Sequence, residues 1–313
     1  MQASLPHPTA TRRRGRPLRW SDRWWALFFL APSLAGILVF VAGPILASIG
    51  ISFTDYDGFD RFRLSIFREY WVGLDNYQRM LTDPRLLRSA GQTLLYTVVT
   101  VPATLAIALV AAVGLNKPLR GITVLRTFYF IPLVTSGVAI ALTWRWIFNP
   151  QVGPINALLD LIGVSGPGWL TSSAWALPAV MITGIWADLP FATIVFLAGL
   201  QSIPHTYYEA ADLDGASASQ KFFHITVPLV SATTFLVLVL SLISALQVFT
   251  TVYVMTQGGP VDATNVVVHF LFEQFRFTYY GYASAIAWVL FAAIFALTLV
   301  QWRIRRRWVV YES

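Results

Sequence analysis

The sequence contains no cysteine and few charged residues. None of its 313 residues is a cysteine, which excludes disulfide bridges, thiol catalysis and thiolate metal sites. Aspartate, glutamate, lysine and arginine make up only 12% of the chain, whereas soluble domains carry about 25%. The nucleotide-binding pattern G-x-x-x-x-G-K-[ST] is also absent, and the four histidines show no metal-ligand spacing. We therefore predict no catalytic site, no metal site and no cofactor bound by this chain itself.

The apolar residues, 56% of the chain, are gathered in blocks of the length that crosses a bilayer, about 20 residues. Backbone groups inside lipid must pair within their own segment, so each block is expected to be helical. The first block is too long for the core of a signal peptide. The sequence therefore predicts an all-α integral membrane protein with six transmembrane helices, at Trp25–Ile51, Thr93–Val113, Phe128–Phe148, Ala174–Leu200, Leu229–Met255 and Ala283–Trp302.

Basic residues indicate which side of the membrane each connection lies on, because cytoplasmic flanks are enriched in lysine and arginine. Six arginines precede the first block, and Arg303 and three further arginines follow the last one. The connection at residues 149–173 contains no lysine or arginine. We therefore expect a multi-pass protein of the cell membrane with both termini in the cytoplasm. The formal charge of +7 is then a topology signal and does not indicate nucleic-acid binding.

The predicted organisation follows from these blocks. Residues 1–24 form a cytoplasmic tail, residues 25–51 the first transmembrane helix, and residues 52–90 an extracytoplasmic segment. Residues 91–302 form a core of the remaining five helices with a cytoplasmic loop at 201–228, and residues 303–313 form a second cytoplasmic tail.

The cytoplasmic loop of this core contains one lysine against three acidic residues, which is unusual for its predicted side of the membrane. Thr206 with Glu209, and Ser217 with Gln220, have the spacing of capping boxes at helix starts. Gly215 between them suits a left-handed helix stop. The pattern predicts two short helices joined by a turn, and this shape fits either a docking surface or an ordinary loop.

Three parts of this loop resemble the EAA loop of binding-protein-dependent ABC importer permeases, namely Glu209-Ala210-Ala211, Asp214-Gly215-Ala216 and Ile225-x-x-Pro228. Further segments resemble the carbohydrate-uptake branch, in particular its maltose-type first permease. They are Val72–Tyr77, Leu200–Pro204 and Thr256–Pro260. The resemblance extends from Trp25 to the C-terminus, but this chain lacks the large extracytoplasmic insertion and the extra helices of the maltose protein.

The resemblance implies an ABC importer type I transmembrane fold and a role in transport, without enzymatic activity in this chain. In that family the loop contains a coupling helix that sits in a cleft of the ATPase subunit. The implied partners are membrane lipid, a second homologous permease, an ATPase dimer that binds ATP–Mg, and an extracytoplasmic binding protein. The binding protein would deliver a sugar or a related polyol as the small-molecule solute. The implied ATPase-coupling residues are Glu209, Ala210, Ala211, Asp214 and Gly215.

Polar residues inside the predicted spans are candidates for the translocation path. Asp188 falls near the middle of the fourth span, where an acid costs about 2.5–3.5 kcal/mol on insertion scales. It is expected to face the path, with a structural ion pair as the alternative. Polar residues recur at helical spacing in the fifth span. They could form hydrogen bonds to a hydroxylated solute, or they could form polar contacts between helices. The predicted path residues are Asp188, Phe191, Ser241, Ser244 and Gln247.

A secondary transporter that uses Asp188 for ion coupling is the alternative function. Folds of that class often contain inverted internal repeats. The sequence shows no convincing repeat.

Overall fold

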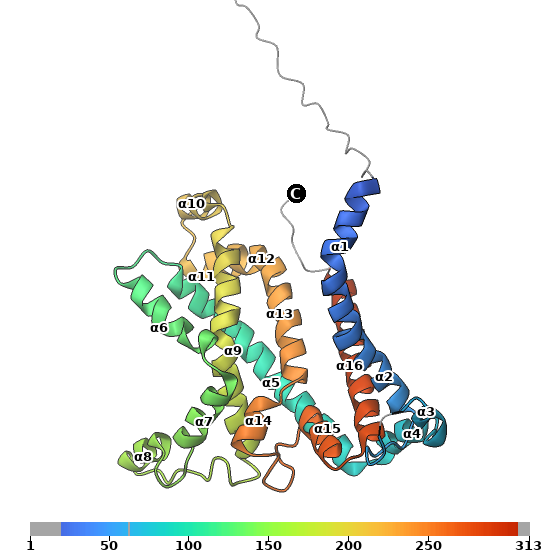
Figure 1. Ribbon diagram of the computed structural model, residues 1–313. Coiled ribbons are helices and arrows are strands. Elements are labelled where there is room, and N and C mark those ends of the chain that lie inside the picture. Colours follow the sequence, from blue (N-terminus) through green and yellow to red (C-terminus); the bar gives the residue numbers. More distant parts are fainter. Residues whose placement is uncertain (1–19, 62, 306–313) are drawn as a thin grey trace, which may run out of the picture. The chain divides into compact units, whose positions relative to one another are not determined.

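The computed structural model describes residues 20–61 and 63–305, and these residues form helices and connections without a β-strand (Figure 1). A single isolated bridge joins Thr54 to Trp71. The chain divides into two compact units, Met1–Gly50 and Ile51–Ser313. Most of the two tails predicted at 1–24 and 303–313 lies outside the described residues.

The described residues of the first unit, 20–50, form a single helical stretch. It contains α1 (Trp20–Ile37), a π-helical turn η1 (Leu38–Ala42) and the greater part of α2 (Gly43–Ser52). Together, Leu27–Ser52 is long and apolar enough to cross a membrane. This stretch matches the first predicted transmembrane helix closely.

The second unit contains the remaining helices. In chain order they are α3 (Ile66–Glu69), α4 (Asp75–Thr82), α5 (Pro84–Leu115), α6 (Ile122–Val134), α7 (Gly137–Ile147), α8 (Pro154–Leu161), α9 (Ala176–Gln201), α10 (His205–Leu213), α11 (Ala218–Lys221), η2 (Phe222–Thr226), α12 (Val227–Leu229), α13 (Ser231–Leu246), α14 (Thr250–Met255), α15 (Val267–Arg276) and α16 (Tyr280–Ile304).

Two of the predicted spans are not continuous helices. The span predicted at Phe128–Phe148 is wrong as one helix, because α6 and α7 meet at an angle of 104°. Pro132 lacks a backbone N–H, and Thr135 has the extended backbone that ends α6. The span predicted at Leu229–Met255 is likewise divided into α12, α13 and α14, with a bend of 67° before α13. The described chain therefore has four helices able to span a membrane, or up to six if each bent pair is one span.

Helix α5 is the longest element of the second unit, and its start is fixed by a local cap. The Asp83 carboxylate accepts from the backbone N–H groups of Arg85 (2.9 Å) and Leu86 (3.3 Å), while Pro84 occupies the first helical position. Both features are favourable at a helix N-terminus, where the first N–H groups have no partner within the helix. Further along, the buried hydroxyls donate to carbonyls one turn earlier, as in the bond from Thr97 to Thr93 O (2.8 Å).

Small residues let α5 and α9 approach closely. A Cβ atom built on Gly184 of α9 would lie 2.0 Å from the Tyr96 hydroxyl oxygen of α5. Towards α10, the same interface buries Ala108, Ala192 and Phe196 together with Val237 of α13. Small residues at helix contacts are the usual way for membrane helices to gain packing energy. This three-helix contact of α5, α9 and α13 forms the centre of the second unit.

The segment Val72–Tyr77 has a structural role in the second unit. The buried Asn76 amide donates to the carbonyls of Ser52 (3.0 Å) and Thr54 (2.8 Å). Gly281 of α16 lies so close to the same backbone segment that a Cβ atom on it would be 1.8 Å from the Thr54 carbonyl oxygen. The motif therefore fastens the segment after α2 to the start of α16.

Candidate functional site

The predicted coupling loop forms a helix–turn–helix, α10 and α11, at one end of the second unit, opposite α8 and α15 (Figure 1). Gly215 has φ +73°, which is the left-handed conformation expected for a helix stop. Its N–H donates to Asp212 O (3.1 Å), and the Ala216 N–H donates to Ala211 O (2.9 Å). This pair of bonds is the Schellman arrangement, which satisfies carbonyls at a helix end. A Cβ atom at Gly215 would meet nothing within 4 Å, so only the backbone conformation favours glycine there.

One of the two predicted capping boxes is confirmed and the other is wrong. The Ser217 hydroxyl accepts from the Gln220 N–H (3.3 Å), and the Gln220 side chain accepts from the Ser217 N–H (2.7 Å). At the earlier site Pro204 takes the N-cap position and α10 begins at His205, so Thr206 already lies inside the helix. A residue in the first turn of a helix cannot serve as its cap.

Glu209 therefore has no capping role. Within the described residues its carboxylate forms no hydrogen bond or ion pair, and the side chain is exposed. Ala210 beside it is also exposed, and Leu213 at the end of α10 is 91% exposed. An exposed acid next to an exposed leucine on a short helix gives a surface that is both charged and apolar.

Two contacts connect α10 to the segment that follows the turn. Asp212 forms an ion pair with Lys221, and the Tyr208 and Thr226 hydroxyls lie 3.0 Å apart in a hydrogen bond. A cavity of about 310 Å³ lies beneath the turn. Its lining includes two of the predicted coupling residues and consists of Ala211, Asp214, Ala216, Gln220, Lys221, His224 and Ile225. The helix pair and its turn are thus held together as one small body.

The predicted path residues are divided between two helices. Asp188 and Phe191 lie on α9, and Ser241 and Ser244 lie on α13, while Gln247 is the first residue after α13 ends. Within the described chain no hydrogen bond joins the α9 pair to the other three, and Asp188 forms no ion pair. The structural ion pair inside this chain, one alternative for Asp188, is therefore not found among the described residues.

A second cavity, of about 230 Å³, lies in the bend between α6 and α7, and the sequence analysis did not anticipate it. The rings of Trp144 and Trp186 meet edge to face there, with centroids 5.7 Å apart. Sequence patterns could have drawn attention to the two tryptophans, but not to the bend that brings them together. The lining consists of Thr135, Ile140, Thr143, Trp144, Ile147 and Trp186.

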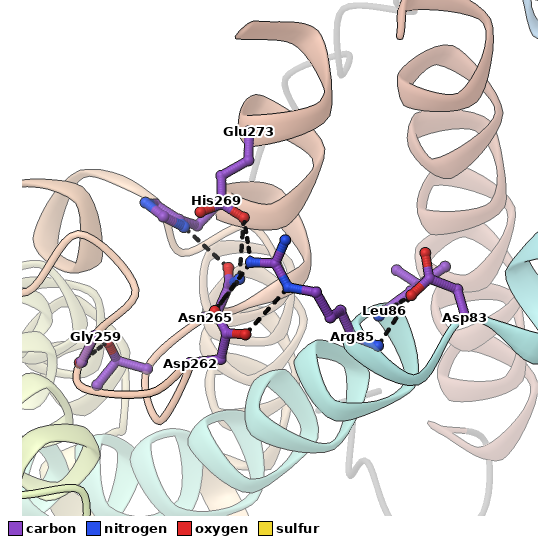
Figure 2. Close-up of polar contacts among 9 residues, drawn as sticks. Asp83, Arg85, Leu86, Gly259, Asp262, Asn265, His269 and Glu273 are labelled. Carbon is purple, nitrogen blue, oxygen red and sulfur yellow. Dashed lines mark hydrogen bonds and ion pairs between the residues drawn. The ribbon is translucent and has the colours of Figure 1, made fainter. Parts of the chain in front are cut away.

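A group of polar side chains lies at the end of the second unit opposite α10, and the sequence analysis gave it no role (Figure 2). We call it the Arg85 cluster. The Arg85 guanidinium donates to both carboxylate oxygens of Asp262, from Nε (3.1 Å) and Nη2 (3.0 Å), and from Nη2 to Glu273 (3.0 Å). The Asn265 amide donates to Asp262 (3.1 Å) and Glu273 (3.2 Å) and lies 2.9 Å from His269 Nδ1. The cluster thus joins α5, α15 and the connection before α15.

Electrostatics in the Arg85 cluster follow from these contacts. The hydrogen bond from Arg85 holds the pKa of the Asp262 carboxyl below its usual value, so the acid remains charged. Burial lowers the pKa of His269, because a cation is poorly solvated there. His269 is 3% exposed and packs beside Gly258.

Comparisons with known proteins agree on the class of this chain. A family model described as "Binding-protein-dependent transport system inner membrane component" matches residues 84–310. The chain is 36% identical over 307 residues to the probable ABC transporter permease protein YesP of Bacillus subtilis, covering 96% of each chain. It is 34% identical over 289 residues to the trehalose/maltose transport system permease protein MalF of Thermococcus litoralis, covering 92% of this chain and 96% of that one. It is 33% identical over 313 residues to the sulfoquinovosyl glycerol transport system permease protein SmoG of Agrobacterium fabrum, covering 96% and 99%.

A solved structure shows the same fold. It is a bacterial ABC transporter involved in the import of the acidic polysaccharide alginate, and one of its chains superimposes with a TM-score of 0.77 at 23% identity. The match covers 92% of this chain and 98% of that one. With the family match over most of the chain, this similarity leads to one conclusion: the protein is a multi-pass membrane protein that belongs to the inner membrane components of binding-protein-dependent transport systems.

Proposed function

We propose that this chain is the permease subunit of an ATP-driven importer of a sugar or a related polyol. Two relatives that are at least 33% identical are named for the transport of trehalose and maltose or of sulfoquinovosyl glycerol. All three solutes are small glycosides that carry many hydroxyl groups. The path residues predicted on α9 and α13 offer hydroxyl, amide and aromatic groups, which suit such a solute.

The observation that carries the proposal is the exposed helix–turn–helix of α10 and α11. Glu209 has no partner of its own within the described chain, and the 91% exposed Leu213 stands beside it. An exposed carboxylate beside an exposed leucine gives a partner chain both a charged and an apolar contact on one short helix. The partner for this surface is the ATPase dimer, with Glu209, Ala210, Ala211, Asp214 and Gly215 in the contact.

The membrane arrangement belongs to the same proposal. Each bent helix pair counts as one span, which gives six spans, and both termini are cytoplasmic. The arginine-rich flanks support this orientation. The α10 surface then faces the cytoplasm and the Arg85 cluster lies at the extracytoplasmic side.

In the proposed mechanism the energy comes from ATP–Mg held by the ATPase chains. Closure of the ATPase dimer moves α10 and α11, and the contact between α5, α9 and α13 carries this movement into the spans. The path between this chain and a second, homologous permease then opens alternately to each side. An extracytoplasmic binding protein supplies the solute. The alternative of ion-coupled secondary transport finds no support in the comparisons, because the family is binding-protein-dependent.

Co-purification tests the proposal. A tagged chain taken from its native membrane in mild detergent should retain an ATPase and a second permease. Recovery of the chain alone, under conditions that preserve other complexes of this family, would contradict it.

A charge reversal then tests the α10 surface. Glu209→Lys should lower ATP-driven uptake strongly while the chain still inserts in the membrane. Glu69→Lys on α3 is the matched control, because Glu69 is also exposed but lies at the other end of the second unit. Equal uptake by the two variants would remove Glu209 from the coupling site.

A further inference from the structure

The chain breaks between α13 and α14 at a place where its sequence provides no reason for a break. Helix α13 ends at Leu246, and Gln247, Val248 and Phe249 precede α14. Breaks in helices usually occur at proline, at glycine or at a bulge. The residues from Leu246 to Thr250 include neither proline nor glycine. Contacts from elsewhere in the chain must therefore hold the break.

Val252 and Met255 of α14 belong to apolar clusters that include residues of α7 and α9, and aromatic rings on α15 contact the break itself. The Phe249 ring, with backbone angles φ −141° and ψ −59°, meets the Phe272 ring edge to face at 5.1 Å between centroids. Tyr253, in the first turns of α14, meets Phe272 in the same way at 5.4 Å. The His269 ring lies 6.3 Å from Phe249 and 6.2 Å from Tyr253. Aromatic pairs in such arrangements contribute beyond the area they bury, so α15 stabilises the geometry of the break.

Helix α15 is in turn held by the Arg85 cluster. His269 and Glu273 lie one turn apart on α15, and both belong to the cluster shown in Figure 2. Arg85 donates to Glu273 directly, and it is connected to His269 through Glu273 and Asn265. It also stacks on the buried ring of Phe270, with its guanidinium carbon 5.4 Å from the ring centroid. The planar fork of arginine suits this simultaneous pairing, which lysine cannot reproduce.

We propose that Arg85 is a positioning residue that keeps the break at residues 247–249 in place through α15. A contiguous set of contacts runs from Arg85 to Glu273, through Asn265 to His269, and then to the Phe249 ring. The break includes Gln247 and begins three residues after Ser244, and both residues are assigned to the solute path. This inference rests on the proposed function for its meaning in transport, but the contacts themselves do not depend on that function.

The absence of cysteine provides a direct test of the geometry. A single thiol at Gln247→Cys, in an exposed position, reports how accessible the break is to a water-soluble thiol reagent. A second thiol at Asn116→Cys, exposed at the far end of α5, serves as the reference. Labelling rates are measured on the purified complex, and they require no knowledge of the solute.

Arg85→Gln should change the labelling rate at Gln247→Cys by about tenfold and leave the rate at Asn116→Cys unchanged. Phe249→Leu should produce a change of the same kind, and the double variant should change the rate by less than the product of the two. Arg88→Gln is the matched control. It removes the same charge one turn further along α5, where the side chain makes no hydrogen bond to the cluster in the described structure.

Three results would overturn the proposal. The first is a labelling rate at Gln247→Cys that Arg85→Gln changes by less than twofold, and the second is an equal change of that rate in Arg88→Gln. The third is an equal change of the labelling rates at both thiols, because it would indicate general loosening of the structure. If Arg85→Gln is not recovered as a complex, Glu273→Gln replaces it, with the same expected change and the same opposing results. Because no step uses the solute or ATP, failure here is distinct from failure of the importer proposal.

Discussion

The close approach of α5 and α9 leads to a quantitative prediction for Gly184→Ala. The new Cβ atom would lie 2.0 Å from the hydroxyl oxygen and 3.0 Å from Cζ of Tyr96. Tyr96 is 3% exposed, so its ring cannot turn out into solvent. Either the ring or the two helices must move.

Two opposing terms set the size of the effect. Overpacking of a filled interior costs about 1–3 kcal/mol, whereas alanine in place of glycine favours a helix by about 1 kcal/mol. A double-mutant cycle with Tyr96→Phe separates them, because the helix term is present in both backgrounds and cancels. Removal of the hydroxyl relieves the contact at 2.0 Å and leaves the one at 3.0 Å. We expect an interaction energy of about 1–2 kcal/mol between the two positions.

Thermal unfolding of the purified chain in detergent, followed by tryptophan fluorescence, measures this energy. For a chain of this size an interaction of 1 kcal/mol corresponds to a shift of about 1.5 °C in Tm. Gly91→Ala on α5 is the control, since a Cβ atom there meets nothing within 4 Å and the variant should be no less stable than the parent. If Gly184→Ala lowers Tm equally with and without the Tyr96 hydroxyl, the packing argument is refuted.

Three further predictions concern the two ends of the second unit and the path between them. Gly215→Val should reduce uptake per ATP hydrolysed, because a β-branched residue at φ +73° costs about 1–2 kcal/mol. Gly215→Asn should remain close to the parent, and equal uptake per ATP in the two variants would contradict this prediction. Asp188→Asn should alter the kinetics of solute uptake while the ATPase remains in the complex, and unchanged kinetics would leave Asp188 a structural residue. Stability should fall as pH falls below about 6.5, because His269 has a lowered pKa when folded and the unfolded chain takes up the proton first. His269→Asn should flatten this dependence of Tm on pH, and an unchanged slope would exclude His269 as its source.

The coupling loop was the most predictable part of the chain, because its signals act over three or four residues. Gly215 and the Ser217 capping box are defined by backbone geometry next to themselves, and both are confirmed. The error at Thr206 has a local origin as well. Pro204 takes the cap position and starts α10 two residues earlier than the capping-box pattern predicts.

Hydropathy predicts where the apolar segments lie along the chain, but it cannot predict whether a segment is straight or bent. A window average gives the same value for a straight helix and for a pair bent by 104°, as α6 and α7 are. Pro132 was a visible sign of that bend. The break before α14 has no such sign, because its contacts come from helices far along the chain, including the rings on α15.

The two ends of the second unit therefore differ in how their sequence determines their structure. At the α10 end each residue's effect can be anticipated from its own neighbours. At the other end Arg85 pairs with Asp262 and Glu273, which are 177 and 188 residues away along the chain. In the sequence alone these acids look like ordinary solvated loop residues. Single substitutions should consequently suffice to test the coupling loop, whereas the Arg85 cluster requires pairs of substitutions, because each member has an effect only through its partners.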